Sequence, residues 1–269
     1  MNGPDLDDAR DKAHEVGDST AYRWLVRGGL VAFGVVHLLV AYLAVRLAFG
    51  SSGEEASQTG ALRELAKAPF GPLLLWGTSA GLFVIAVWQL LSAFVGHRHL
   101  SGKRRVRRRA ASVGRTVLYS VLGWNAASIA LGGSGGDGGK TASAMLLSMP
   151  FGQILMGLVG VGVAVVGGSQ IMKGVRDKYE EELQGSLSNG QRWIARVGHI
   201  GKGAAIMIVA GLLVWAAWTH DSDTAGGLDT ALQTVRTAPF GVVILVAIAL
   251  GFACYGVYCF IWARHARFH

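Results

Sequence analysis

The tetrapeptide APFG stands at residues 68–71 and again at 238–241, and the related MPFG stands at 149–152. The chain contains five prolines, and three of them precede Phe-Gly in these motifs. Proline lacks an amide hydrogen and has a preset φ, so it suits the first turn of a helix. Each motif lies where a polar segment meets an apolar run, and we expect it to begin a helix. The motif residues are Pro69, Phe70, Gly71, Pro150, Phe151, Gly152, Pro239, Phe240 and Gly241.

The distribution of charge predicts a membrane protein. Half of the residues are hydrophobic (51%), the mean hydropathy is +0.40, and 16% are charged, against about 25% in soluble domains. Asp, Glu, Lys and Arg are absent from six runs, at 28–45, 69–96, 116–133, 150–172, 203–219 and 239–263. Each run has about the length that a helix needs to cross a hydrocarbon core roughly 30 Å thick. We therefore predict an all-α polytopic protein with six transmembrane helices.

The three motifs mark three tandem repeats. Ten residues beyond each motif glycine lies another glycine, at Gly81, Gly162 and Gly251, and these positions predict a strip for close helix packing. Fifteen residues beyond it stand Ala86, Gly167 and Gly256. The first helices also correspond, with Gly34 and Gly203 in one register, although the middle repeat has Thr116 there. Short helical patterns precede the motifs in ALRELAKA, TASAMLLS and LDTALQTVRT. Each unit is thus a helix, a short interfacial helix, Pro-Phe-Gly and a second helix.

The repeats and the positive charges suggest an orientation. Lys and Arg concentrate in the N-terminal tail, in the second and fourth connections and at the C-terminus, which places both termini in the cytoplasm. Parallel repeats are related by an axis along the membrane normal. We expect a pseudo-threefold ring of hairpins, with a side-by-side row as the alternative. The expected divisions are an acidic tail at 1–21, helix pair one at 22–100, a basic loop with helix pair two at 101–180, and a further loop with helix pair three at 181–269.

These features resemble a bacterial six-helix membrane family built of three tandem two-helix repeats, catalogued as domain of unknown function 1206. The resemblance rests on Pro-Phe-Gly with its following glycine and glutamine, and on the final stretch GFACYGVYCFIWARHAR at 251–267. It covers nearly the whole chain after about residue 22. It implies the architecture and no particular activity.

Polar residues within the apolar runs are the candidate functional positions, because such residues are costly in lipid. His37 is a candidate proton-sensitive or ligand-binding group, or a neutral imidazole that bonds between helices. Gln89 and Gln170 occupy equivalent positions, where they could line a vestibule or bridge helices. These candidates are His37, Gln89, Asn125 and Gln170. No carboxylate interrupts the apolar runs, which argues against an ion-coupled transporter or pump.

A basic stretch, KRRVRRR at 103–109, is the strongest local charge signal. On the cytoplasmic side it is expected to contact anionic headgroups. The contact residues would be Lys103, Arg104, Arg105, Arg107, Arg108 and Arg109. A basic stretch that only sets the topology is the alternative. No recognition module for nucleic acid accompanies it.

No catalytic, metal-binding or cofactor-binding constellation emerges from the sequence. We therefore expect a non-enzymatic protein of the bacterial cytoplasmic membrane, which organises partner proteins or lipids through its small-residue faces and basic loop. The expected protein partner is another protein or a second copy of this chain. The alternative is a channel or weakly coupled transporter for a small neutral or apolar solute along the pseudo-threefold centre.

Overall fold

The computed structural model describes residues 20–50, 56–91, 102–133, 138–183, 185–221 and 224–265. Within these ranges six long helices alternate with three short ones, in the order long, short, long for each repeat. The long helices are α2 (Thr20–Ala48), α4 (Gly71–Leu91), α5 (Gly102–Ala130), α7 (Gly152–Val175), α8 (Asn189–Thr219) and α10 (Gly241–His265). The short helices are α3 (Gln58–Ala66), α6 (Gly138–Leu147) and α9 (Leu228–Thr237), and a 3-10 helix, η2 (Lys178–Glu182), follows α7. The predicted all-α class and the repeat unit are confirmed.

Four helices are long and apolar enough to cross a membrane: α2 from Arg27, α7, α8 and α10. In α4 the apolar helix is shorter, at Gly71–Val87. Helix α5 begins at Gly102, immediately before the basic stretch, so KRRVRRR lies in its first turns instead of in the loop that we expected. Charged residues at this end reduce the apolar length that α5 offers. Four of the six expected spans are thus supported by length and composition in the described residues.

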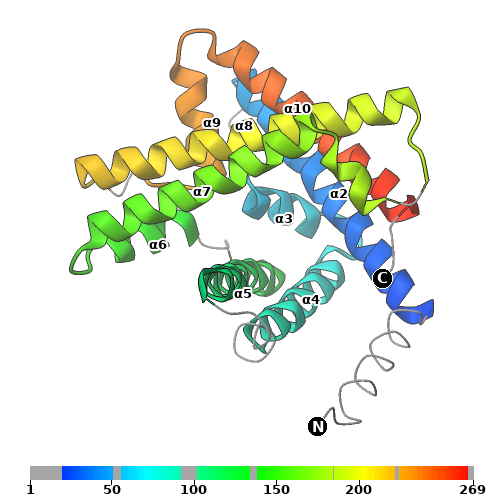
Figure 1. The fold of residues 1–269 in the computed structure, drawn as a ribbon, viewed down its shortest axis with the longest axis horizontal. Helices are drawn as coiled ribbons and strands as arrows, with labels where there is room; N and C mark the ends of the chain where they lie inside the picture. Colours follow the sequence, from blue (N-terminus) through cyan, green and yellow to red (C-terminus); the bar gives the residue numbers. More distant parts are fainter. Residues whose placement is uncertain are drawn as a thin grey trace.

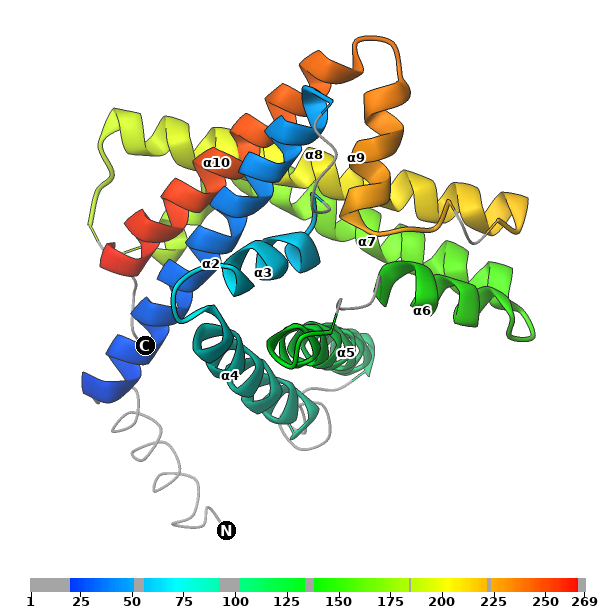
Figure 2. The same cartoon turned by 180° about the vertical axis from the view of Figure 1, so that it is seen from behind.

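The long helices pair between repeats. Helix α4 runs along α5, α7 along α8, and α10 along α2 (Figures 1 and 2). In each pair the second helix of one repeat packs against the first helix of another, and the last helix of the chain returns to the first. Helices α8 and α10 of the third repeat also pack together, whereas no comparable contact joins α2 to α4 or α5 to α7 among the described residues.

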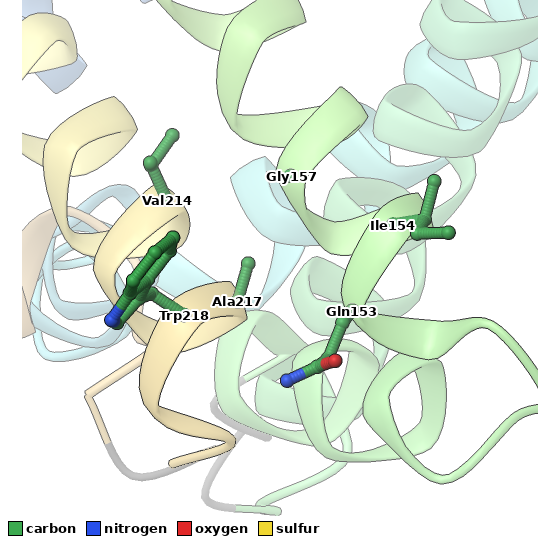
Figure 3. Close-up of a pocket in the computed structure, with 6 residues that line it drawn as sticks. All are labelled: Gln153, Ile154, Gly157, Val214, Ala217 and Trp218. Atoms are coloured by element: carbon green, nitrogen blue, oxygen red, sulfur yellow. The ribbon is translucent and has the colours of Figure 1, made fainter.

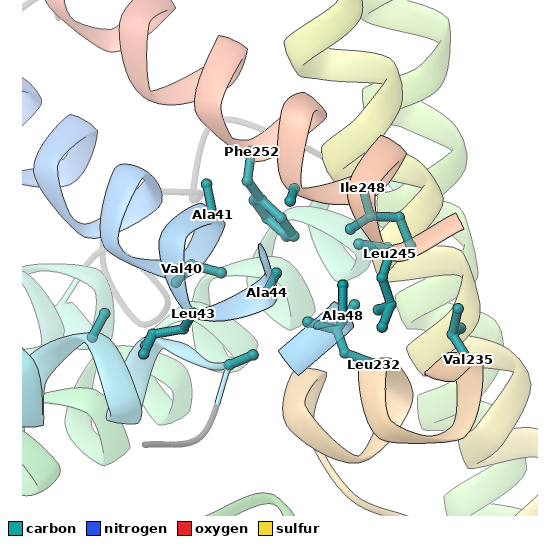
Figure 4. Packing of buried hydrophobic residues seen from close by; sticks show 14 residues of the cluster. Val40, Ala41, Leu43, Ala44, Ala48, Leu232, Val235, Leu245, Ile248 and Phe252 are labelled. Carbon is teal, nitrogen blue, oxygen red and sulfur yellow. The ribbon is translucent and has the colours of Figure 1, made fainter. Parts of the chain in front are cut away.

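The main hydrophobic core lies where the ends of the chain meet. Val40, Leu43 and Ala44 of α2 are buried against Leu245, Ile248 and Phe252 of α10. Leu232 and Val235 of α9 close the outer end of this cluster (Figure 4). A hydrogen bond of 2.8 Å from the Ala56 amide to the Asp229 carboxylate fixes the first outer connection to α9.

The Pro-Phe-Gly motifs form three equivalent joints between a short helix and a long one. Each phenylalanine adopts a left-handed backbone, with φ of 62° at Phe70, 62° at Phe151 and 60° at Phe240. The glycine amide donates to the carbonyl three residues earlier, at 2.8 to 2.9 Å, and φ 62°, ψ 20° at Phe151 fits position i+2 of a type II turn. The proline therefore precedes the helix, the phenylalanine caps it, and the glycine begins it. This corrects the expectation that proline occupies the first turn.

Glycine is required at the third position of the joint by a close backbone approach. A Cβ on Gly71, Gly152 or Gly241 would lie 2.2 to 2.4 Å from a carbonyl oxygen of the preceding short helix. The phenylalanine rings, in contrast, are 79%, 79% and 82% exposed. The joint thus folds the chain tightly while presenting one aromatic ring to the surroundings.

The joint predicts opposite effects for its second and third positions. Gly241→Ala is expected to lower the free energy of unfolding by about 1–3 kcal/mol, because the added methyl group forces the backbone apart. Phe240→Gly is expected to raise it by about 1 kcal/mol, because glycine adopts positive φ without the steric penalty. Thermal unfolding in detergent measures both. A stabilising Gly241→Ala would contradict the assigned geometry.

Candidate functional sites between the helices

The inter-repeat pairs cross at small residues that are equivalent in the three repeats. A Cβ on Gly34 of α2 would lie 2.9 Å from the carbonyl oxygen of Gly256 on α10. A Cβ on Gly203 of α8 would lie 2.8 Å from the carbonyl oxygen of Gly167 on α7. At these two crossings the helix backbones are in direct contact, which requires residues without side chains.

The third crossing differs because the middle repeat carries a threonine. The Thr116 hydroxyl on α5 lies 3.5 Å from the Ala86 carbonyl oxygen on α4 and donates to the Ser112 carbonyl at 3.0 Å. About two turns further along the same pair, the buried Ser79 hydroxyl donates to the Gly123 carbonyl at 2.9 Å. In the α4–α5 pair, hydroxyl groups thus make the contact between the helices. In the other two pairs, glycines allow the backbones to make it directly.

Of the three glycines expected to pack closely, Gly81, Gly162 and Gly251, one does so. A Cβ on Gly81 or on Gly162 would meet nothing within 4 Å. Gly251 does pack closely, since its Cβ would lie 2.6 Å from the Cα of Gly201 where α10 crosses α8. The prediction is therefore corrected for Gly81 and Gly162. The inter-repeat crossings lie at Ala86 and Gly167, five residues further along the same helices, because the partner helix approaches from that side.

His37 is buried (2% exposed) between α2 and α10. Its Nδ1 lies 2.8 Å from the Phe33 carbonyl oxygen, which can only accept, so Nδ1 carries the hydrogen. The ring centre lies 4.3 Å from that of Phe33 and 4.8 Å from that of Tyr255. His37 therefore occupies an aromatic helix interface.

A second buried histidine, His199 of α8, was not among the sequence candidates. Its ring stacks on Tyr179 at 5.4 Å and lies 4.8 Å from the ring of Tyr258. Its neighbour Lys202 directs its ammonium group to Tyr255, 3.9 Å from the ring centre. The charge-free run at 203–219 begins only after Lys202, so the search of the apolar runs for polar residues did not include these two positions. The signal that could have found them is the continuous helical pattern from Asn189 onward.

The turn after α7 is fixed by a charged cluster. Arg196 donates through Nη2 and Nε to the two carboxylate oxygens of Asp177, at 2.6 and 3.2 Å. The buried Tyr179 donates its hydroxyl to the same carboxylate at 2.7 Å. The Arg196 hydrogen bonds hold the pKa of Asp177 below its ordinary value, and burial raises the pKa of Tyr179. Asp177 has φ 53°, a region that aspartate tolerates better than most residues.

The remaining polar candidates lie in different helix pairs. Asn125 is buried on α5, which pairs with α4. Gln170 lies on α7, and its side-chain oxygen is buried without a hydrogen-bond partner in the structure. The side chains of Gln89 and of residues 102–111 lie outside the described residues, so a role for the glutamine or for the basic stretch stays a prediction. The structure brings His37, Asn125 and Gln170 into no common site among its described contacts.

An apolar groove of about 480 Å³ lies between the start of α7 and the end of α8. Ile154 and Gly157 of α7 line one side of it, and Val214 and Ala217 of α8 line the other. Figure 3 shows Gln153 and Trp218 at the same end of the groove. The Gln153 side chain contacts the His220 ring, while Trp218 is 84% exposed. The groove is thus apolar along its length and polar at one end.

The comparisons with known proteins follow the three repeats. The family described as Domain of Unknown Function (DUF1206) matches residues 28–96, 110–177 and 197–266. The chain belongs to this family. Each DUF1206 segment runs from the first long helix of a repeat to the second, which confirms the resemblance inferred from the Pro-Phe-Gly motifs.

A bacterial relative matches over most of its length. The chain is 36% identical over 239 residues to the uncharacterized protein YxxB of Bacillus subtilis (strain 168), and the alignment covers 86% of either chain. No solved structure matches the chain. The described residues hold no group of three or more His, Cys, Asp or Glu side chains that could bind a metal ion.

The crossing points predict a contrast between two glycines of similar sequence context. Gly256→Val is expected to reduce the free energy of unfolding by about 1–3 kcal/mol, because the side chain would collide with Gly34 and Leu38. Gly162→Val serves as the matched control, since its side chain meets open space. Unfolding by denaturing detergent measures both variants. Equal effects of the two substitutions would contradict the assigned crossing.

The charged cluster predicts a dependence on pH. Because the pKa of Asp177 is lowered in the folded protein, its ionised form stabilises the fold at neutral pH, and this contribution disappears as the pH falls below about 4. Asp177→Asn should therefore be less stable than the wild type at pH 7, and the difference should narrow in acid. Glu181→Gln, at an exposed carboxylate of the same turn, is the control. A constant difference across this range would refute the assignment.

Proposed function

We propose that this protein is a six-span, non-enzymatic protein of the bacterial cytoplasmic membrane that binds and organises lipids. Both termini lie in the cytoplasm, as the concentration of Lys and Arg in alternate connections indicates. Successive long helices then cross the membrane in opposite directions. The three Pro-Phe-Gly joints and the short helices lie on its outer side.

The pairing of the helices supports a pseudo-threefold arrangement. Three equivalent pairs, α4 with α5, α7 with α8 and α10 with α2, connect the repeats in a closed cycle. Two of these pairs cross at equivalent glycines and the third at Ala86 and Thr116. A row of three hairpins would leave the first and last long helices unpaired, so the contact of α10 with α2 favours the ring.

Large apolar side chains on the outer faces of the helices support contact with lipid. Val84 on α4, Val117 on α5 and Val165 on α7 are each more than half exposed. Such faces need an apolar environment, which the bilayer core provides.

The groove between α7 and α8 is the observation that carries the lipid-binding function. Its apolar lining between two helices suits part of an acyl chain, and its polar end at Gln153 lies beside the exposed indole of Trp218. Tryptophan is enriched at the boundary between headgroups and acyl chains. An acyl chain in the groove would therefore place its headgroup at the outer surface beside Gln153 and Trp218.

The experiment fills the groove and measures the lipid that remains bound. Gly157→Leu, whose side chain would enter the groove toward Ala217, is expected to reduce lipid that co-purifies with the protein at least about threefold, because an apolar chain loses the contacts it would make there. Gly162→Leu is the control, because a side chain there meets open space. Native mass spectrometry from mild detergent counts the bound lipids.

Two results would contradict the proposal. If Gly157→Leu and Gly162→Leu retain equal amounts of lipid, the groove is not the lipid-binding site. Solute flux across liposomes that increases with the amount of wild-type protein, and that depends on His37 or Gln170, would replace lipid organisation by a transport function.

A further inference from the structure

The polar end of the α7–α8 groove is formed by two side chains that contact each other across the helix pair. Gln153 is the second residue of α7, and His220 follows the last residue of α8. Nε2 of Gln153 contacts Nδ1 of the imidazole, and Figure 3 shows this amide nitrogen turned toward the end of α8. Because an amide nitrogen only donates, Nδ1 accepts, and the neutral imidazole carries its hydrogen on Nε2.

The backbone fixes the position of both residues at the surface of the helix pair. Gln153 follows the glycine of a Pro-Phe-Gly joint, where a Cβ on Gly152 would collide with the Leu146 carbonyl oxygen. His220 ends α8 in a left-handed conformation, with φ 58° and ψ 22°. The His220 side chain is exposed and Gln153 is half-buried. A ligand that approaches along the surface therefore reaches both side chains.

The contact leaves one acceptor and one donor for a ligand. The amide oxygen of Gln153 can accept a hydrogen bond, and the Nε2–H group of His220 can donate one. Among the described residues, the structure gives neither atom a further partner. A hydroxyl group matches this pair, because it donates and accepts at the same time. The oxygens of an ionised phosphate only accept, so they leave the amide oxygen without a donor.

The charge at this end of the groove gives an anion no advantage. The groove is lined by no Lys or Arg in the described part of the chain. The start of α7 and the end of α8 lie together here, so the opposite ends of the two helix dipoles largely cancel. The residue next to His220 is Asp221, which is negatively charged. A phosphate would therefore lose hydration here without gaining a cation as a partner.

We propose that the lipid in this groove has an uncharged headgroup with a free hydroxyl, as in a diacylglycerol. Part of one acyl chain lies between Ile154 and Val214, which line opposite sides of the groove. The hydroxyl oxygen accepts from His220 and its hydrogen is donated to Gln153. The exposed indole of Trp218 lies at the same end, as expected at the boundary between acyl chains and headgroups. This inference rests on the proposed lipid-binding function and names the class of lipid.

The test compares three lipids that have the same acyl chains and differ only in the headgroup. They are dioleoylglycerol, its 3-O-methyl ether, which accepts but cannot donate, and dioleoyl phosphatidic acid, which is anionic. Native mass spectrometry from mild detergent measures how much of each lipid the full chain retains at equal concentration. The wild type is expected to retain dioleoylglycerol about fivefold better than the ether, the factor that corresponds to one hydrogen bond of about 1 kcal/mol. Phosphatidic acid should be retained least.

Substitutions at the two polar residues have different expected effects on the three lipids. Gln153→Leu removes the acceptor, so dioleoylglycerol and its ether should be retained equally. His220→Gly removes the donor without backbone strain, since glycine adopts positive φ freely, and it should lower retention of both lipids about fivefold. Gln153→Lys introduces a cation and should raise retention of phosphatidic acid. Thr219→Val is the matched control without effect, because the Thr219 hydroxyl donates to the Trp215 carbonyl of its own helix.

The outcomes separate the lipid class from the proposed function. If the wild type retains the ether or phosphatidic acid as well as dioleoylglycerol, while Gly157→Leu still lowers retention, the headgroup class is overturned and the groove stands. An unchanged preference for dioleoylglycerol over its ether in Gln153→Leu would overturn the assigned contact. If the wild type retains none of the three lipids, the proposed function itself fails. Circular dichroism checks the fold of each variant, and His220→Gly tests the same hydroxyl contact if Gln153→Leu does not fold.

Discussion

The arrangement of this protein depends on direct contact between helix backbones. At Gly34 with Gly256, and at Gly203 with Gly167, a carbonyl oxygen of one helix lies where a side chain of the other would be. In a bilayer the lipid chains are as apolar as the helix surfaces, so association is driven by close packing and polar contacts. Helices that offer a glycine at the crossing can approach most closely, and these contacts select partners from different repeats. Two of the three pairs that close the cycle have such a contact, and in the third pair the hydroxyl groups of Thr116 and Ser79 contact the partner backbone instead.

A second constraint acts at the ends of the helices. The three Pro-Phe-Gly joints bring the start of a long helix against the end of a short one, at a distance that only glycine permits. Each joint also holds a phenylalanine at positive φ, which is costly for a bulky residue. Glycine would adopt this conformation freely, so the backbone alone does not account for phenylalanine at all three positions. The exposed ring is the feature that the three copies share.

The repeat unit could be predicted from the sequence because its motif occurs three times at similar spacing. The spacing of the motifs gave the helix starts at Gly71, Gly152 and Gly241, and the short outer helices, which the structure contains. Which long helices pair with each other could not be predicted from the motifs. Several positions on the same helix face carry small residues, and only the direction of the partner's approach distinguishes Gly167 from Gly162.

The candidate sites show a related limit of sequence reasoning. Charge-free runs mark the most apolar part of a helix, but helices continue beyond these runs, so the search for polar candidates did not reach His199 and Lys202, which belong to α8. His37 was identified because it interrupts an apolar run. Its aromatic neighbours on α10 could not be identified, since they are about 220 residues distant in the chain and no local pattern connects them.

The return of α10 to α2 has a consequence for biosynthesis. Helix α2 leaves the ribosome well before its partner α10, which begins only at Gly241. At a synthesis rate of roughly 5–20 residues per second, α2 waits about 10–40 s before α10 emerges. During that interval the glycine face of α2 lacks its partner helix from this chain, and the cycle of helix pairs closes only when α10 arrives.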